Sequence, residues 1–144
     1  MTFSKLRYSM HIYNDPGKRE LFDDKARFNK TFADYIHRDW IDVTDASYTD
    51  FQALVTKHSS FFDKGPSGMF GKNAGKYDTA DKIIEDLNRE LKDKGCIIEE
   101  LIRQSPQLAI FNSTSVNTFR VVTLLCTDDC PKVMAAVLRV GRNG

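Results

Sequence analysis

The sequence lacks most of the features that identify a specialised class of protein. It has three cysteines, Cys96, Cys126 and Cys130, and no group of histidines beside them that would complete a zinc site. We therefore expect reduced thiols that pack as small apolar groups. A disulfide between Cys126 and Cys130 is compatible with a tight turn but uncommon in the cytosol.

Long hydrophobic runs and an excess of one charge are also missing. No apolar stretch approaches the ~20 residues that span a bilayer, and the first residues lack the continuous apolar segment of a signal peptide. The formal net charge is only +1, which gives no reason to expect nucleic acid or an anionic membrane as the main partner. These absences predict a cytoplasmic protein.

The composition and the spacing of apolar residues predict one α+β domain. Apolar residues make up 41% of the 144 positions, enough for a hydrophobic core. Their spacing alternates between helical and strand-like periods. Helices are expected within 18–36, from a cap at 45–47 to about 57, and over 78–94; strands are expected at 40–43, 61–62, 96–98, 115–127 and 133–140. The last two strands are predicted to form a hairpin.

Local signals mark the ends of two predicted helices. Asp23 or Asp24 is expected to cap a helix that starts at Lys25. Gly95 fits the left-handed position that follows the helix ending at residue 94.

The segment 65–76 combines glycine with lysine. It holds four glycines and two lysines, and Lys64 directly precedes it. Glycine lets the backbone approach an anion closely, and lysine adds positive charge. The spacing differs from that of a Walker A loop. The segment is therefore either an anion-binding loop or a solvated surface loop.

Four stretches of sequence carry a family resemblance. They are Asp-Asp-Lys-Ala-Arg-Phe-Asn-Lys (23–30), Gly-Met-Phe-Gly-Lys (68–72), Gly-Cys-Ile-Ile-Glu-Glu-Leu-Ile-Arg-Gln (95–104) and Ser-Val-Asn-Thr-Phe-Arg-Val-Val-Thr-Leu-Leu (115–125). Together they resemble the ATP-grasp superfamily. More narrowly, they resemble the sugar-transfer-associated ATP-grasp family found near bacterial polysaccharide-synthesis enzymes.

The resemblance implies a single, partial ATP-grasp domain over 1–144. Its parts would be an N-terminal extension (1–20), an N-terminal lobe (21–98) with the glycine-rich loop (65–76), and a hinge with the start of a C-terminal lobe (99–144). In this family the acidic and asparagine ligands of magnesium follow the strand that here ends near Gly141. We therefore expect the metal ligands beyond residue 144 and a chain that is a fragment.

By position, the resemblance assigns phosphate contacts to Lys25 and Lys64. The family's Lys-Pro pair is interrupted here by one residue after Lys64, which leaves Lys72 as a substitute. The alternative is that these lysines are solvated surface charges. Gly68 and Gly71 would belong to the loop that closes over the phosphates.

The resemblance also places an adenine-binding hinge at Ile98–Leu101. A carboxylate of Glu99 or Glu100 would accept a hydrogen bond from the ribose or the adenine amine, with Leu101 beside the ring. Only one of the two carboxylates is expected to face the cleft. The alternative is an acidic helix N-terminus.

Arg120 is the catalytic residue that the resemblance implies. It lies in an apolar β-run where a charge needs a partner, either phosphate or an acidic substrate, or else a structural ion pair. Asn117 and Thr118 would shape the same rim. The three histidines, including His58, belong to no recognisable cluster.

By the same resemblance, the intact protein would be an ATP-dependent carboxylate–amine or carboxylate–thiol ligase using ATP and Mg²⁺. ATP would convert an unknown carboxylate to an acylphosphate, from which an amine displaces phosphate. That route needs no protein nucleophile, and the sequence shows no Ser/His/Asp set. The setting would be cell-surface polysaccharide synthesis. This chain alone, without metal ligands, is expected to be inactive.

Two alternatives belong to other classes. One is a non-catalytic nucleotide-binding or interaction module, and the other is a small α+β domain that binds no nucleotide. An open sheet edge at the end of the chain would favour a homo-oligomer.

Overall fold

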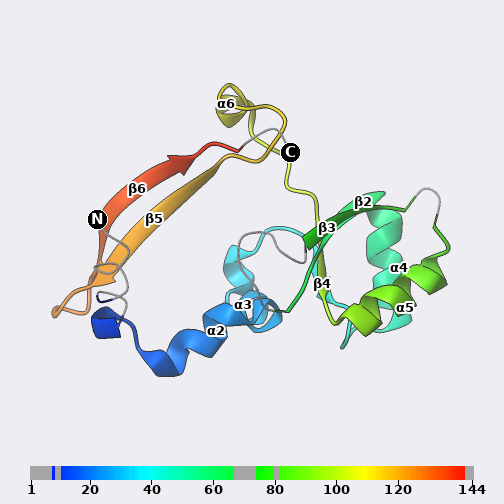
Figure 1. Cartoon of the computed structure of the whole chain (residues 1–144), viewed down its shortest axis with the longest axis horizontal. Helices are drawn as coiled ribbons and strands as arrows, with labels where there is room; N and C mark the ends of the chain where they lie inside the picture. The colour runs from blue at the N-terminus through cyan, green and yellow to red at the C-terminus, as the bar shows by residue number, and fades with distance from the viewer. Residues whose placement is uncertain (1–7, 9–10, 67–73, 80–81, 142–144) are drawn as a thin grey trace. The chain divides into compact units, whose positions relative to one another are not determined.

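The computed structural model describes Tyr8 and residues 11–66, 74–79 and 82–141. The chain forms two compact units (Figure 1). One unit is Asn14–Leu101, which we call the sheet unit. The other combines Met1–Tyr13 with Ile102–Gly144, and we call it the hairpin unit. The fold is α+β with antiparallel sheets, as the sequence predicts.

The sheet unit is built on four antiparallel strands. They are β1 (Trp40–Asp42), β2 (Ser60–Lys64), β3 (Ala74–Asp78) and β4 (Ile97–Glu100), in the spatial order β1-β4-β2-β3. The connections from β1 to β2 and from β3 to β4 therefore each pass over one strand. Each of these connections contains a helix, α4 (Tyr48–Lys57) in the first and α5 (Ile84–Lys94) in the second.

The core lies between one face of this sheet and the helices α4 and α5 (Figure 1). Side chains alternate along a strand, so Phe61 of β2 and Ile98 of β4 point to this face and are fully buried. The other buried members of the cluster are Val43, Phe51, Leu54, Val55, Leu87, Leu91 and Cys96. The core thus covers one face of the sheet, and the opposite face of the sheet is available for other contacts.

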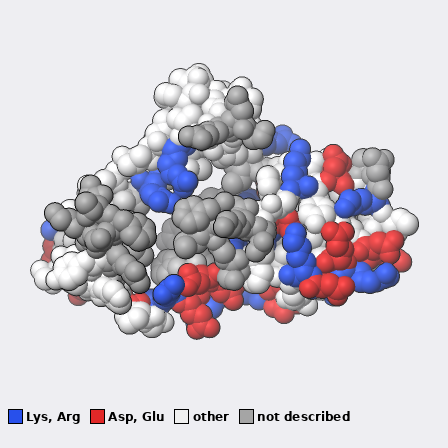
Figure 2. Space-filling model, viewed as in Figure 1, with Lys and Arg blue, Asp and Glu red and all other residues white. Residues whose placement is uncertain are grey.

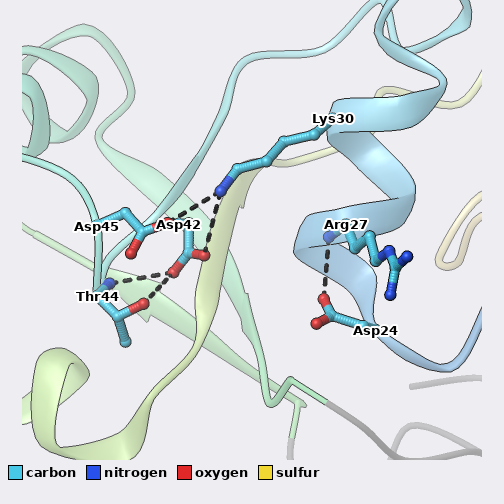
Figure 3. Close-up of polar contacts among 6 residues, drawn as sticks. All are labelled: Asp24, Arg27, Lys30, Asp42, Thr44 and Asp45. Carbon is cyan, nitrogen blue, oxygen red and sulfur yellow. Dashed lines mark hydrogen bonds and ion pairs between the residues drawn. The ribbon is translucent and has the colours of Figure 1, made fainter. Parts of the chain in front are cut away.

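Short helices precede the sheet in the chain. They are η1 (Pro16–Lys18), α2 (Arg19–Asp23), α3 (Lys25–Thr31) and η2 (Ala33–Tyr35). The helix expected within 18–36 is thus broken at Asp24. The backbone of Asp24 is extended, and Oδ1 of Asp24 accepts a 2.9 Å hydrogen bond from the Arg27 amide (Figure 3). The cap predicted for a helix starting at Lys25 is confirmed.

Lys30 of α3 forms ion pairs with acidic residues at the end of β1 and in the turn that follows it. Its Nζ lies 2.9 Å from Asp45 Oδ2 and 4.0 Å from Asp42 Oδ2 (Figure 3). The hydrogen bond with Asp45 raises the pKa of Lys30. The Asp42 carboxylate also accepts bonds from the amide and hydroxyl of Thr44 at 3.1 and 2.6 Å. These contacts set the position of α3 relative to the sheet.

Two boundaries differ from the sequence-based expectation. The helix expected to begin at 78 begins at Ile84, and Ile83, expected on its apolar face, is exposed. The strand β3 (Ala74–Asp78) takes up the end of the segment expected as the glycine-rich loop (65–76) and the first residue expected in that helix. The Gly75 amide donates a 2.6 Å bond to Asp63 Oδ1, and a Cβ at Gly75 would lie 2.8 Å from that oxygen. Glycine is therefore needed for this close pairing of β3 with β2.

The end of α5 follows the expectation. Gly95 adopts φ 62° and donates to the carbonyls of Leu91 and Lys92, which satisfies acceptors at the helix end. The strand β4 then continues through Glu99 and Glu100. The alternative that these two carboxylates begin a helix is therefore wrong.

The hairpin unit contains α6 (Pro106–Ala109), β5 (Thr118–Leu125) and β6 (Pro131–Arg139). The strands pair antiparallel with an irregularity between Val122 and Thr123, so the predicted hairpin is confirmed. Cys126 and Cys130 flank its turn as free thiols, and Cys96 is free as well.

Basic and acidic side chains are interspersed on the part of the surface formed by α4 and α5 (Figure 2). This mixture accords with the small net charge. Within the described residues, the structure has no helix of the length and apolarity required to cross a membrane.

Candidate functional site

A pocket of about 360 Å³ lies in the sheet unit, on the sheet face opposite the core. Helices α2 and α3 contribute one wall and the strands β2, β3 and β4 contribute another. The lining residues are Phe22, Lys25, Phe28, Asn29, Arg38, Lys64, Gly65, Ala74, Ile97 and Glu99. We call it the cationic pocket, because three basic side chains and one carboxylate supply all the charge among these residues.

Local structure explains why the polar side chains converge. In β2, alternation sends Asp63 to the core face and Lys64 to the pocket. In β4 the same alternation sends Glu99 to the pocket. On α3, Lys25 and Asn29 are four residues apart and therefore lie on the same side of the helix.

Glu99 is the centre of the pocket's charge network. Its side chain is only 2% exposed, and one carboxylate oxygen contacts Lys64 while the other contacts Arg38. A buried carboxylate needs such partners, because desolvation of an unpaired charge is costly. With Lys25 added, three cations face one carboxylate, so the pocket retains an excess of positive charge.

This excess is reflected in the pKa of Lys64, which is lowered to about 8. Burial is the largest cause, and the positive charges of Arg38 and Lys25 add to it. The contact with Glu99 favours the charged form and therefore acts in the opposite direction. Burial also lowers the pKa of Arg38. Additional negative charge in the pocket would stabilise both cations.

Lys25 joins α3 to the residues that follow β2. Its Nζ donates a 2.8 Å hydrogen bond to the carbonyl of Gly65, and its amide donates a 3.3 Å bond to the carbonyl of Pro66. The ammonium group is therefore held at the start of the segment that the resemblance assigns to phosphate binding.

Asn29 contributes an unused hydrogen-bond donor. Its side chain is 3% exposed, and within the described part of the chain Nδ2 has no hydrogen-bond partner. An unpaired buried donor costs about 1–3 kcal/mol, a cost that an oxygen of a bound ligand would remove. Asn29 lies in the 23–30 motif, one helical turn after Lys25, and this spacing was the signal in the sequence that could have identified it.

Of the residues predicted for nucleotide binding, the structure brings Lys25, Lys64 and Glu99 to one pocket. Glu100 points to the opposite face of the sheet, so one carboxylate of the pair faces the pocket. Leu101 is the half-buried last residue of the sheet unit. The remaining predicted residues, Gly68, Gly71 and Lys72, lie outside the described residues. Arg38 and Asn29 are pocket residues that the sequence did not indicate.

Arg120, the predicted catalytic residue, belongs to the hairpin unit. It is exposed on β5, opposite Val137 of β6. Thr118 is exposed on the same strand. The assignment of Arg120 to catalysis stays a prediction.

Asn117 has a structural role within the hairpin unit, and its expected place at the rim of the cleft stays a prediction. It is 3% exposed, and its amide and side chain are fully engaged. Its partners are the Gln104 side chain (2.5 Å), the carbonyls of Leu108 (2.8 Å) and Asn112 (2.9 Å) and the Gly141 amide (3.0 Å). Asn117 thus ties four segments of the unit together, because a buried amide must satisfy its hydrogen bonds.

His58 also differs from the expectation that no histidine joins a cluster. Its Nε2 lies 2.6 Å from Asp39 Oδ2 and 3.6 Å from Glu100 Oε2. The three residues are distant in the sequence, and so no local pattern indicated the cluster.

Comparison of the chain with protein-family models, with curated proteins and with solved structures finds no match. The function must therefore be argued from the chemistry of the chain's own residues.

Proposed function

We propose that the cationic pocket binds the phosphates of ATP and that the chain is the ATP-binding part of an ATP-grasp ligase. The observation that carries the proposal is the convergence of Lys25, Lys64 and Arg38 on a pocket that also holds Nδ2 of Asn29, a donor with no hydrogen-bond partner among the described residues. A polyphosphate supplies both missing partners, negative charge and hydrogen-bond acceptors.

The proposal explains why three cations surround a single carboxylate. In the free protein, Glu99 holds Lys64 and Arg38 in place. A bound phosphate would share these cations with Glu99 and would add the acceptor that Asn29 lacks. Preorganised positive charge of this kind stabilises a phosphoryl group during transfer.

The reaction class comes from the family resemblance. ATP would phosphorylate a carboxylate, and an amine or thiol would then displace phosphate from the acylphosphate. Among the described residues that line the pocket, Glu99 is the only carboxylate, and it is already paired with two cations. Among the described pocket residues there is thus no suitable ligand for Mg²⁺, and we assign none of the reaction steps to a metal here.

The proposed setting is bacterial cell-surface polysaccharide synthesis in the cytoplasm, which also comes from the resemblance. A nucleotide that binds without turnover, even in a longer protein, would favour the alternative of a non-catalytic nucleotide-binding module.

Calorimetric titration with ATP and with inorganic triphosphate tests the proposal. Lys64→Ala removes one cation, and Asn29→Asp replaces the unpaired donor with a carboxylate at nearly constant size. Each is expected to weaken binding of both ligands by about tenfold or more, because charge-assisted hydrogen bonds contribute about 1.5–3 kcal/mol. Lys92→Ala, which removes an exposed lysine of α5, is the matched control and should bind normally.

The two ligands separate phosphate recognition from adenine recognition. If triphosphate binds nearly as well as ATP, the pocket recognises phosphate alone and the hinge contributes little. Absence of binding by the folded protein, or equal binding by wild type and Lys64→Ala, would contradict the proposal.

A further inference from the structure

Asp39, His58 and Glu100 bring three metal-ligating atoms together on the core side of the sheet unit. One atom from each residue lies within 4.8 Å of the other two. Asp39 directly precedes β1, His58 directly follows α4, and Glu100 is the last residue of β4. All three side chains are half-buried. We call this group the Asp-His-Glu cluster.

We propose that the Asp-His-Glu cluster is a binding site for a divalent transition-metal ion, with Zn²⁺ as the best match. One imidazole nitrogen and two carboxylate oxygens form a donor set that suits Zn²⁺ rather than Mg²⁺ or Ca²⁺, which prefer oxygen ligands. Three protein ligands are also the number found in zinc sites that keep a position open for water.

The donor atoms all lie within 4.8 Å of one another, and the two distances from His58 can be compared with those around such an ion. Bond lengths of about 2.0–2.2 Å in a tetrahedral site place the donors roughly 3.3–3.6 Å apart. The distance from His58 Nε2 to Glu100 Oε2 is already 3.6 Å. The distance to Asp39 Oδ2 is 2.6 Å and would have to increase by roughly 1 Å, which a rotation of the Asp39 carboxylate provides. Nε2 would then present its lone pair to the metal, with the ring proton on Nδ1.

The backbone holds the three residues in place without an ion. The Glu100 amide donates to the Asp39 carbonyl at 2.9 Å, and the Asp39 amide donates to Glu100 Oε2 at 3.0 Å. The His58 amide donates to the Leu54 carbonyl at the end of α4 at 2.9 Å. A site on strand and helix ends loses little conformational freedom when an ion binds.

The ammonium group of Lys57 pairs with one carboxylate of the cluster. Its Nζ lies 2.5 Å from Asp39 Oδ2, and this contact raises the pKa of Lys57 and lowers that of Asp39. The Lys57 side chain is 65% exposed, so it can move into solvent when a metal ion takes its place. An ammonium group and a metal ion would therefore compete for the same carboxylate.

The cluster shares none of its residues with the cationic pocket. Alternation along β4 puts Glu99 in the pocket and Glu100 in the cluster, on opposite faces of the sheet. The inference consequently stands whether or not the pocket binds ATP.

Titration of ZnCl₂ alone into the nucleotide-free protein tests the inference. The titration uses a Cys126→Ser, Cys130→Ser background, because these thiols are not fully buried and thiolates bind zinc. We expect one Zn²⁺ per chain and a thermal midpoint that rises with Zn²⁺ concentration, since an ion that binds only the folded state stabilises it. Co²⁺ substitution should give the visible absorption of a coordinated ion.

Variants of the ligand His58 and of its neighbour Lys57 are expected to change the affinity for Zn²⁺ in opposite directions. His58→Ala removes the nitrogen ligand and should weaken Zn²⁺ binding by at least about tenfold. Lys57→Gln removes the competing cation and should strengthen binding by about two- to fivefold, the range expected for an exposed ion pair. His11→Ala, at an exposed histidine outside the sheet unit, is the matched control and should change nothing.

Any one of the following results would overturn the inference: no saturable Zn²⁺ binding by the folded background protein, equal affinity after His58→Ala, or unchanged affinity after Lys57→Gln. The last variant keeps all three proposed ligands, so it remains informative if His58→Ala fails to fold. If His58 had only a structural role, His58→Ala would lower the thermal midpoint by the same amount with and without Zn²⁺. That result would also overturn the inference.

Discussion

The sheet unit and the hairpin unit form strands equally well but differ in what covers those strands. In the sheet unit, β2 and β4 pack one face against α4 and α5, and every buried hydrophobic residue in the described part of the chain lies there. In the hairpin unit, most apolar side chains of β5 and β6 are exposed. Strand pairing follows from local pattern, whereas a core needs a second layer, and a two-stranded hairpin alone is marginally stable.

Matched leucine truncations should give the largest contrast between the units. Leu91 of α5 is 0% exposed and Leu125 of β5 is 66% exposed. Leu91→Ala should lower the free energy of unfolding by about 2–5 kcal/mol, because it leaves a cavity in the core. Leu125→Ala should change it by less than about 0.5 kcal/mol. Denaturant unfolding measures both, and similar losses would mean that the hairpin contributes to a core.

The hairpin unit should instead depend on a buried polar residue. Asn117→Ala removes the side-chain bonds to the Leu108 and Asn112 carbonyls and from the Gly141 amide. At about 0.5–1.5 kcal/mol each, these bonds predict a loss of about 2–4 kcal/mol. Hydrogen exchange at the Gly141 amide should accelerate accordingly. The exposed Thr118→Ala serves as control, and unchanged protection in Asn117→Ala would contradict the structural role assigned to this residue.

The cationic pocket gives the sheet unit a pH dependence that we do not expect for the hairpin unit. The pKa of Lys64 is lowered to about 8, and a bound polyanion favours the charged form. Affinity for triphosphate should therefore fall by about tenfold for each pH unit above 8, until the pKa in the complex is reached. Lys64→Arg, which remains charged throughout, should show a flat profile. A slope equal to that of wild type would show that another group titrates.

The smallest contrast concerns two positions with positive φ, one in each unit. Gly95 has φ 62° with nothing close to an added Cβ, and Asp129 in the hairpin turn has φ 55°. Gly95→Ala should cost about 1 kcal/mol of stability, the penalty of a left-handed non-glycine residue. Asp129→Gly should change stability by less than about 0.5 kcal/mol, because aspartate tolerates this conformation. Thermal unfolding distinguishes the two, and a large loss in Asp129→Gly would indicate an unrecognised role of that side chain.

Much of the fold could be predicted because its signals are local. The cap at Asp24, the left-handed Gly95 and the hairpin of β5 and β6 each depend on residues close in the sequence. The strand β3 was missed because its residues have little strand propensity. It forms where Gly75 can approach Asp63 of β2 closely, a contact that only the paired strands reveal.

In the candidate sites, too, some features follow from local sequence and others depend on contacts between distant segments. From the sequence we could expect that only one of the neighbouring carboxylates Glu99 and Glu100 faces the pocket, and their alternation along β4 accounts for this. The meeting of Arg38 and Asn29 with Lys64 around Glu99, and that of Asp39 and His58 with Glu100, became visible only in the folded chain. These residues come from separate elements, and their meeting depends on how helices pack against the sheet, which no local pattern encodes.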